Sequence, residues 1–260
     1  VLIMKIALIG AGNLATVLGH ALYNAKHDIV QVYSRTMAAA KQLAERLNAV
    51  PTDDLETITN DADLYIIALK DSVLYEVIGK ICPNRSEKLF VHTAGSMPID
   101  VFRGRTERYG VLYPMQTFSK TRIVDFRNIP VFVEANSIST MQTIIGVAQS
   151  VSDNVQELSS TDRRYLHLAA VWACNYVNHC YDLAAEVLQK VGLPFDVMLP
   201  LTDETARKIH ELSPREAQTG PAIRYDENII EAQMQLMNDN PNARKIYELM
   251  AKSIHEKSKK

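Results

Sequence analysis

The chain has 260 residues, 47% of them hydrophobic, and its 28 basic and 30 acidic residues give a formal net charge of −2. This length is enough for one large domain or two smaller ones, each with its own core. The balanced charge gives no electrostatic reason to expect nucleic acid or an anionic membrane as a partner, and no apolar run has the length that spans a bilayer.

The cysteines and the first residues predict the compartment. Cys82, Cys174 and Cys180 are odd in number and lack metal-ligand spacing, so we expect reduced thiols and no metal site. No basic and apolar signal-peptide pattern precedes the first glycines. These features predict a cytoplasmic protein without a membrane partner.

A short apolar run at residues 6–9 leads into a glycine turn and then into a helical pattern. Backbone N–H groups and the positive end of the helix then point at one place where an anion can sit. Gly10 makes the tight turn, Gly12 lets a pyrophosphate approach the backbone, and the small Ala15 lets the helix pack close to the sheet. The alternative is a strand–turn–helix that binds nothing. The predicted cofactor contacts of this turn are Gly10, Ala11, Gly12, Asn13 and Leu14.

Strands and helices alternate through the first half of the chain. This alternation predicts an α/β fold with a doubly wound, mostly parallel sheet, whose ligand lies beyond the carboxyl ends of the strands. The loops at that edge begin at Gly10, Ser34, Lys70 and His92, so Ala68, Leu69 and Lys70 are further predicted cofactor contacts. The expected strands are residues 29–33, 62–69, 89–92, 109–114, 129–134 and 155–158, and the expected helices 15–25, 36–47, 73–81 and 137–151.

The end of the second strand distinguishes NADP from NAD. An NAD site places an acidic residue about twenty positions after the glycines, where it holds the ribose hydroxyls. This chain has Ser34-Arg35-Thr36 there. Arg35 can pair with a 2′-phosphate, and Ser34 and Thr36 can donate hydroxyls to it. The sequence therefore predicts NADP, while a solvated Arg35 and a helix-capping Thr36 are the plainer alternatives.

Near Ser159-Ser160 the pattern becomes entirely helical, which predicts a cofactor domain at residues 1–159 and a helical substrate and dimerisation domain at 160–260. The helix predicted over 162–191 is apolar on most faces, as expected for a helix buried in a core or an interface. We therefore expect a homodimer through this domain. Further helices are predicted at 195–212, 226–238 and 241–255.

Polar side chains also line the long helix. His167, Asn175, Asn178 and Asp182 have spacings of eight, three and four, which put them on one helical face. A polar stripe on a buried helix needs hydrogen-bond partners. It forms a cleft wall facing substrate or nicotinamide, a set of interhelical hydrogen bonds, or an exposed edge.

The chain resembles the superfamily of pyrroline-5-carboxylate reductase, F420-dependent NADP oxidoreductase and 6-phosphogluconate dehydrogenase. It is most similar to a subgroup of NADP oxidoreductases that join a Rossmann domain to a C-terminal helical domain of unassigned function. The resemblance covers nearly the whole chain and implies an NADP-binding Rossmann fold. It rests on Gly10-Ala-Gly-Asn-Leu-Ala15, His92-Thr-Ala-Gly-Ser96, Leu112-Tyr-Pro-Met-Gln-Thr-Phe118 and Thr219-Gly-Pro-Ala-Ile-Arg-Tyr-Asp226.

Two departures from the resemblance concern the chemistry. The subgroup usually has His-Pro where this chain has Tyr113-Pro114. The hydroxyacid dehydrogenases of the superfamily use a lysine one turn before an asparagine. If Asn175 is that asparagine, Val171 or Trp172 stands in the lysine position, so the lysine mechanism is not inherited.

These observations lead to two principal hypotheses. The first is an NADP(H)-dependent oxidoreductase that moves hydride to or from a small carbonyl or imine substrate. His92 and His167 are its predicted proton donors, with Tyr113 third, and Asn175 would orient the substrate. The second is a protein that binds or senses NADP(H), or binds a partner, without turnover. A deazaflavin of the F420 type is a third possibility as redox partner.

Overall fold

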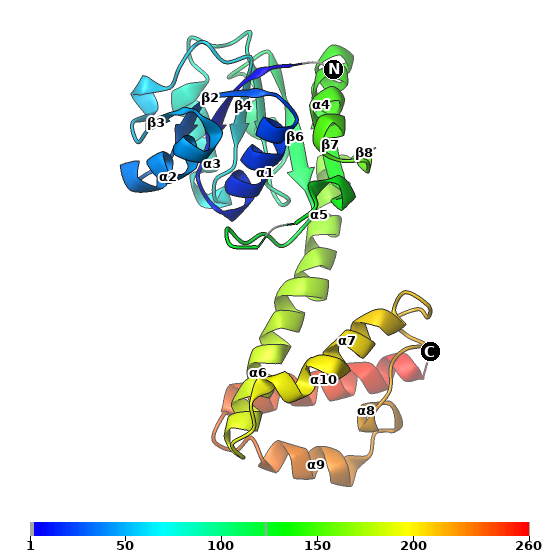
Figure 1. Ribbon diagram of the computed structural model, residues 1–260. Coiled ribbons are helices and arrows are strands. Elements are labelled where there is room, and N and C mark those ends of the chain that lie inside the picture. The colour runs from blue at the N-terminus through cyan, green and yellow to red at the C-terminus, as the bar shows by residue number, and fades with distance from the viewer. Residues whose placement is uncertain (1–2, 123, 260) are drawn as a thin grey trace. The chain divides into compact units, whose positions relative to one another are not determined.

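The structure is a computed structural model that describes residues 3–122 and 124–259. The chain divides into two compact units, Val1–Asn175 and Tyr176–Lys260. All strands that the structure describes lie in the first unit, and helices cover both faces of its sheet (Figure 1). The predicted boundary at residues 159–160 falls where the last strand gives way to helix, and the compact units divide further along that helix.

The first unit contains an eight-stranded sheet with the order β3-β2-β1-β4-β5-β6-β7-β8. Every neighbouring pair is parallel except β6 and β7. The strand order reverses between β1 and β4, which is where a doubly wound fold opens a crevice for its ligand. The strands are β1 (Lys5–Ile9), β2 (Asp28–Tyr33), β3 (Val50–Thr52), β4 (Leu64–Ile67), β5 (Leu89–His92), β6 (Arg108–Pro114), β7 (Val131–Ala135) and β8 (Val155–Glu157).

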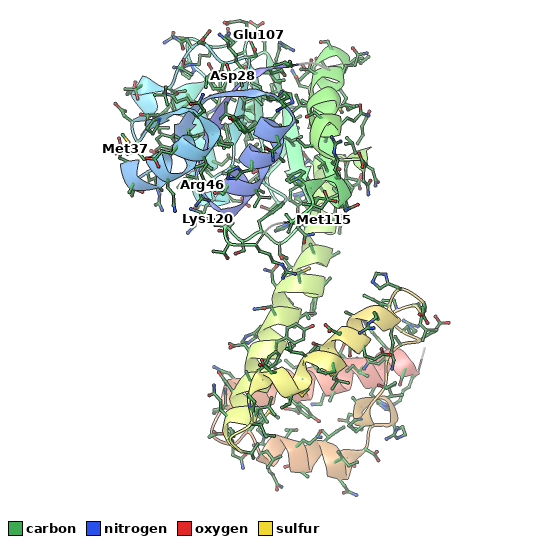
Figure 2. The ribbon with its side chains drawn as sticks, viewed as in Figure 1. Asp28, Met37, Arg46, Glu107, Met115 and Lys120 are labelled. Carbon is green, nitrogen blue, oxygen red and sulfur yellow. The ribbon has the colours of Figure 1, made fainter. Side chains whose placement is uncertain are left out.

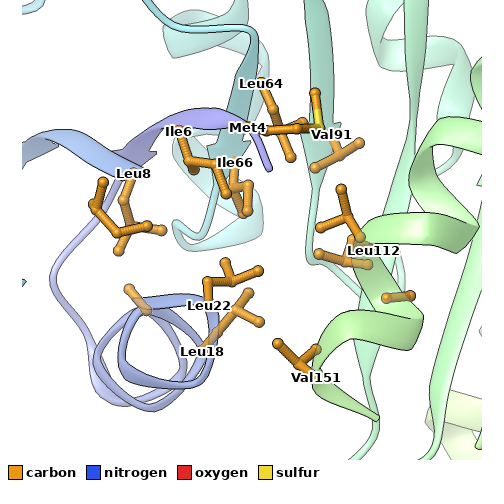
Figure 3. Close-up of a cluster of buried hydrophobic side chains, with 14 of the residues drawn as sticks. Met4, Ile6, Leu8, Leu18, Leu22, Leu64, Ile66, Val91, Leu112 and Val151 are labelled. Carbon is orange, nitrogen blue, oxygen red and sulfur yellow. The ribbon is translucent and has the colours of Figure 1, made fainter. Parts of the chain in front are cut away.

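The side chains of these strands alternate between two cores, as the pleat requires. Ile6 and Leu8 of β1 belong to one buried cluster, and Ala7 and Ile9 belong to the other. Because both faces are covered, the central strands are apolar along their length rather than every second residue. The first cluster packs Leu18 and Leu22 of α1 against β1, β4, β5 and β6 (Figure 3).

The helices of the first unit cover the sheet with apolar stripes at helical spacing. In α3, Leu74, Val77, Ile78 and Ile81 are buried at intervals of three, one and three. The stripes of α1, α2 and α4 enter the first cluster, and that of α3 enters the second, so the two sides of the sheet are closed by different helices. The helices are α1 (Asn13–Asn24), α2 (Met37–Leu47), α3 (Asp71–Ile81) and α4 (Ile138–Val151).

The predicted fold class is confirmed, and the differences are local. Strand β3 was not predicted, because it has only three residues and one of them is Pro51. β7 begins at Val131, immediately after Pro130, which has no N–H group for the strand ladder. Two short 3-10 turns, η1 (Leu55–Thr57) and η3 (Phe126–Asn128), each begin at an aspartate that accepts a capping hydrogen bond.

The predicted long helix is interrupted. It consists of α5 (Ser160–Ala170), a π-helical segment η4 (Val171–Tyr176) and α6 (Val177–Gln189). Ser159 caps its start by accepting a hydrogen bond from the backbone N–H of Asp162. Among the described residues of these three segments, Arg163 is the one that is buried, so the expected burial of the apolar faces is not reached within a single chain.

The second unit is helical. A small core joins α9 (Glu227–Gln235) to α10 (Pro241–Ser258) through Ile230, Met234 and Ala251. Gly220, with φ +103°, precedes the short helix α8 (Pro221–Arg224), while η5 (Phe195–Met198) and α7 (Leu199–Lys208) follow α6. No helix within residues 3–122 and 124–259 is long and apolar enough to cross a membrane.

Candidate functional site

The glycine turn between β1 and α1 has the geometry of an anion site. Gly10 has φ +131°, and a Cβ there would collide with the carbonyl oxygen of Ala68. A Cβ added at Gly12, in contrast, would meet no atom within 4 Å. Gly12 is the N-cap of α1, and no side chain caps the helix. The first N–H groups of α1 are therefore left for an external acceptor at an open backbone position.

The end of β2 carries the three residues predicted to select the cofactor. Ser34 is partly buried, whereas Arg35 and Thr36 are exposed. Thr36 is the N-cap of α2 in an extended conformation, but its hydroxyl makes no capping hydrogen bond. The first turn of α2 contains no acidic residue. This edge therefore presents a cation and hydroxyl groups to a phosphate. No carboxylate in the first turn of α2 would repel it.

The end of β4 lies beside the glycine turn. The backbone N–H of Ala68 donates to the carbonyl of Ile9, which fixes the two strand ends together. Leu69 is partly buried, and the exposed Lys70 is the N-cap of α3. The structure thus brings the predicted cofactor residues of β1 and β4 to one edge.

A tyrosine–histidine pair stands at the same edge, beyond β5 and β6. Tyr113, only 8% exposed, is the second-last residue of β6. Figure 2 shows Glu107 before this strand and Met115 after it at opposite ends of the first unit. The Tyr113 hydroxyl lies 3.1 Å from Nδ1 of His167 on α5. The rings meet edge to face with centroids 6.2 Å apart.

Gly95 is packed beneath this pair. A Cβ at Gly95 would lie 2.6 Å from Nδ1 of His167 and 2.9 Å from Cζ of Tyr113, so the two side chains rest on its bare backbone. The neighbouring Ser96 donates its hydroxyl to the carboxylate of Asp71, the first residue of α3. The loop after β5 therefore touches both α3 and the tyrosine–histidine pair.

Burial raises the pKa of the Tyr113 hydroxyl above its usual value. The nearby Arg163 guanidinium works in the opposite direction, and Asp71 and Cys174 add to the increase. Tyr113 is consequently a protonated phenol at neutral pH, which is the state that can donate a proton.

His92, the first predicted proton donor, is the last residue of β5, but its side chain is buried inside the first unit. The side chain is fully buried and stacks on Phe102 with centroids 5.7 Å apart. Its Nδ1 accepts a hydrogen bond from the N–H of Ala94 at 3.1 Å, and its Nε2 lies 3.4 Å from the carbonyl of Pro98. Burial, reinforced by Arg163, lowers the pKa of His92 to about 3, so the ring is neutral.

The depressed pKa of His92 predicts that acid destabilises the protein. Between pH 3 and 6.5 the unfolded chain holds one more proton than the native state at this residue, so its stabilising effect is complete above pH 6.5 and declines as the pH falls. The expected slope is about 1.4 kcal/mol per pH unit. Urea unfolding at pH 7 and pH 5 measures it, and His92→Gln should reduce the dependence by about one proton. Identical slopes in both proteins would contradict this assignment.

Asn175 is exposed and lies within the π-helical segment η4. A π-helix contains more residues in each turn than an α-helix, so the α-helical spacing between His167 and Asn175 does not apply. Asn178 and Asp182 belong to α6 in the second unit. The polar stripe predicted from spacing is therefore divided by a change of helix type at Val171–Tyr176.

One buried ion pair of the first unit was not predicted from the sequence. Arg163 is completely buried, and its Nη1 donates to Oε2 of Glu134 at 2.5 Å. No sequence pattern predicts an ion pair between a helix residue and a strand residue 29 positions earlier. In the second unit, Arg224 pairs with Asp226 at 3.3 Å. Among the described residues, no group of three potential ligands could hold a metal ion.

Two family profiles match the chain. Residues 5–95 match a family described as NADP oxidoreductase, coenzyme F420-dependent, and residues 129–254 match a domain of unknown function, DUF2520. No curated protein matches the chain. The first profile covers the glycine turn, the end of β2 and the end of β4.

Solved structures resemble the chain over nearly its whole length. A proposed NADP oxidoreductase from Bacteroides fragilis is 53% identical, covers 98% of both chains and has a TM-score of 0.94. An imine reductase from Myxococcus stipitatus in complex with NADP+ is 15% identical, covers 98% of this chain and 94% of its own, and has a TM-score of 0.72. A 1-pyrroline-5-carboxylate reductase from Streptococcus pyogenes is 15% identical, covers 98% of both chains and has a TM-score of 0.63.

The two reductases at 15% identity show the fold alone, whereas the Bacteroides fragilis protein shows the family. The resemblance inferred from the glycine turn and the later motifs is confirmed. The chain belongs to the Rossmann-type NADP oxidoreductases, with an N-terminal domain of the F420-dependent NADP oxidoreductase family and a C-terminal DUF2520 domain.

Proposed function

We propose that this protein is an NADP(H)-dependent reductase that moves hydride to a small imine or carbonyl compound and completes the reaction with a proton from Tyr113. The observation that carries the proposal is the hydrogen-bonded pair of Tyr113 and His167. It stands at the sheet edge that also carries the glycine turn. A dinucleotide site and a buried proton donor at one edge are the two parts that such a reductase requires.

The residues at this edge fit NADP. The open backbone at Gly12 and the uncapped start of α1 suit a pyrophosphate, and Arg35 with the free capping position of Thr36 suits a 2′-phosphate. Ala11, Asn13 and Leu14 would complete the turn, and Ala68, Leu69 and Lys70 would border the crevice from β4. NADPH, when bound, supplies the hydride.

Tyr113 and His167 then account for the proton. When hydride adds to the carbon of a C=N or C=O group, the nitrogen or oxygen gains an electron pair and takes the hydroxyl proton of Tyr113. His167, whose Nδ1 lies 3.1 Å from the Tyr113 oxygen, then passes a proton to the phenolate and takes one from solvent in return. The reduced substrate therefore gains one hydride and one proton. Both ring nitrogens of His92 lie within hydrogen-bond distance of backbone groups in the loop after β5, so we assign His92 to holding that loop. Asn175 remains the candidate for orienting substrate.

The experiment follows NADPH oxidation at 340 nm with a cyclic imine, 2-methyl-1-pyrroline, and with simple aldehydes and ketones. Transfer of deuterium from [4-²H]NADPH into the product would establish hydride transfer. Tight NADPH binding without oxidation in any reaction would favour the alternative, a protein that binds or senses NADP(H). Oxidised coenzyme F420 forms a further arm, because the matching family is described as F420-dependent.

Arg35→Ala should weaken NADPH binding by about 10- to 100-fold and leave NADH binding nearly unchanged, because a charged hydrogen bond contributes about 1.5–3 kcal/mol. Fluorescence titration with both cofactors measures the two dissociation constants. The matched control is Arg46→Ala, which removes an exposed arginine from the last turn of α2. A variant that kept the wild-type preference for NADPH would exclude Arg35 from the phosphate site.

We also propose that residues 1–159 bind NADP and that residues 160–260 contribute the substrate wall and form a homodimer. The support is the apolar surface of this helical region in one chain. Sedimentation velocity at micromolar concentration should give a dimer, and a monomer would contradict the proposal. The exposed apolar side chains of this region include Leu168, Leu193, Val197, Leu199, Leu201, Ile209, Leu236 and Leu249.

A further inference from the structure

We propose that Arg163 is a positioning residue for the Tyr113–His167 pair and acts with Glu134 to hold α5 and the loop after β5 in the geometry that the proton step needs. This inference rests on the proposed function, because it concerns the same pair. Arg163 itself touches neither Tyr113 nor His167 through a hydrogen bond that the structure shows.

The first observation is the burial of the arginine. Its side chain is 0% exposed, and its partner Glu134, at the end of β7, is 18% exposed. Arginine is rarely buried completely unless it is paired. The short contact of 2.5 Å supplies that pairing, so the position of Arg163 is fixed by charge as well as by packing.

The second observation is the number of segments that meet at the guanidinium. Nη2 donates to the carbonyl of Met97 at 2.6 Å and to the hydroxyl of Ser160 at 3.2 Å. The Ser160 hydroxyl donates to Glu134 at 2.6 Å and accepts from the N–H of Ile99 at 2.9 Å. One network therefore joins the start of α5, the end of β7 and the loop that follows β5.

These are the segments that carry the proton pair. His167 follows Arg163 by four residues, so it lies one turn later on the same face of α5. Gly95 lies two residues before Met97, in the loop that the guanidinium holds. Because His167 and Tyr113 both rest on Gly95, a shift of either the helix or the loop changes their separation. A displacement of about 1 Å can reduce a catalytic rate about a hundredfold.

The charge of Arg163 supports the same role. Burial raises the pKa of Tyr113, and the guanidinium opposes this increase. The other groups that face Tyr113 are Asp71 and Cys174, which raise its pKa, and His167, which is hydrogen-bonded to it. Glu134 neutralises the guanidinium at closer range. Losing Arg163 should therefore move the phenol titration upward.

A double variant, Arg163→Met with Glu134→Met, distinguishes an effect on the geometry of the Tyr113–His167 pair from an effect on the stability of the fold. Replacing a buried ion pair by apolar side chains of similar volume commonly preserves the fold. Arg163→Lys is the second variant, because it keeps the charge but lacks the planar fork that reaches Glu134 and Met97 together. Arg127→Met is the matched control, since Arg127 forms an exposed pair with Asp153.

Three readouts apply to each variant: the NADPH dissociation constant, kcat with 2-methyl-1-pyrroline or the best substrate found, and the imidazole ¹⁵N signals of His167, assigned with His167→Asn. We expect the double variant to bind NADPH within about twofold of wild type, to lose at least about tenfold in kcat, and to lose the Nδ1 shift that reports the Tyr113 hydrogen bond. Arg163→Lys should show the same changes to a smaller extent, and Arg127→Met none.

Wild-type kcat together with an unchanged His167 spectrum in the double variant would overturn the proposal. Should that variant not fold, an unchanged spectrum and kcat in Arg163→Lys would overturn it equally. The imidazole spectrum needs no turnover. A wild-type protein without reductase activity would therefore refute the proposed function, and a spectral change in the variant would still show that Arg163 positions the pair.

Discussion

Tyr113→Phe should lower kcat by about 10²- to 10⁴-fold, the range that a positioned general acid contributes. The substitution removes one oxygen atom and keeps the ring that packs with Val111 and Phe132. NADPH binding and the unfolding midpoint should therefore change little. Steady-state NADPH oxidation and a fluorescence titration of NADPH measure the two effects on the same preparation.

His167→Asn provides the companion measurement. If His167 restores the proton on Tyr113, the double variant should be no slower than the slower single variant, because residues that act as one unit are not additive in their effects. The control is Tyr109→Phe, a tyrosine on the same strand. A Tyr113→Phe enzyme with kcat within threefold of wild type would show that the proton comes from another group.

The Rossmann half of the fold was predictable because its signals are local. The glycine turn, the apolar central strands and the stripe of α3 each depend on residues within about ten positions of one another, which is the range over which hydrophobic periodicity is read. Each of these segments was correctly predicted. The exception, β3, is too short for any periodicity to show.

The proposed proton site could be predicted only in part, because its members are distant in sequence. His167 and Tyr113 were both named as candidates, but the hydrogen bond that joins them spans 54 residues. His92 ranked first because it follows a strand that ends at the cofactor edge. The strand pleat instead directs it, like Phe90, toward the core near Phe102. Only the tertiary structure reveals that burial.

The helix change at Val171–Tyr176 has a similar cause. The sequence there is apolar and continuous with the flanking helical pattern, so it predicts one α-helix. A π-helical turn differs from an α-helical turn only in that each N–H bonds to the carbonyl five residues earlier instead of four. No residue type specifies that difference. It alters the angular relation of Asn175 to His167, two residues that we assign to the proposed site. A prediction based on spacing fails at this place for that reason.

Arg163→Ala should reduce the free energy of unfolding by about 3–5 kcal/mol, because it leaves the carboxylate of Glu134 in a largely buried position without its cation. Domains are commonly stable by only about 5–15 kcal/mol, so the variant should unfold at a much lower urea concentration. Ser160 would be the one remaining partner that the structure shows for Glu134. Urea unfolding monitored by circular dichroism measures the difference.

Arg127→Ala is the matched control for stability. Its ion pair with Asp153 has side chains 52% and 75% exposed, so the expected loss is about 0–1 kcal/mol. A loss below 1 kcal/mol for Arg163→Ala as well would mean that water reaches Glu134 and replaces the arginine. The apolar double variant should recover most of the stability that Arg163→Ala loses, because it leaves no unpaired charge behind. The double variant would then recover the free energy of unfolding but not kcat. Apolar side chains can replace the stabilising effect of the Arg163–Glu134 pair, whereas they form no hydrogen bonds that hold α5 and the loop after β5 in place.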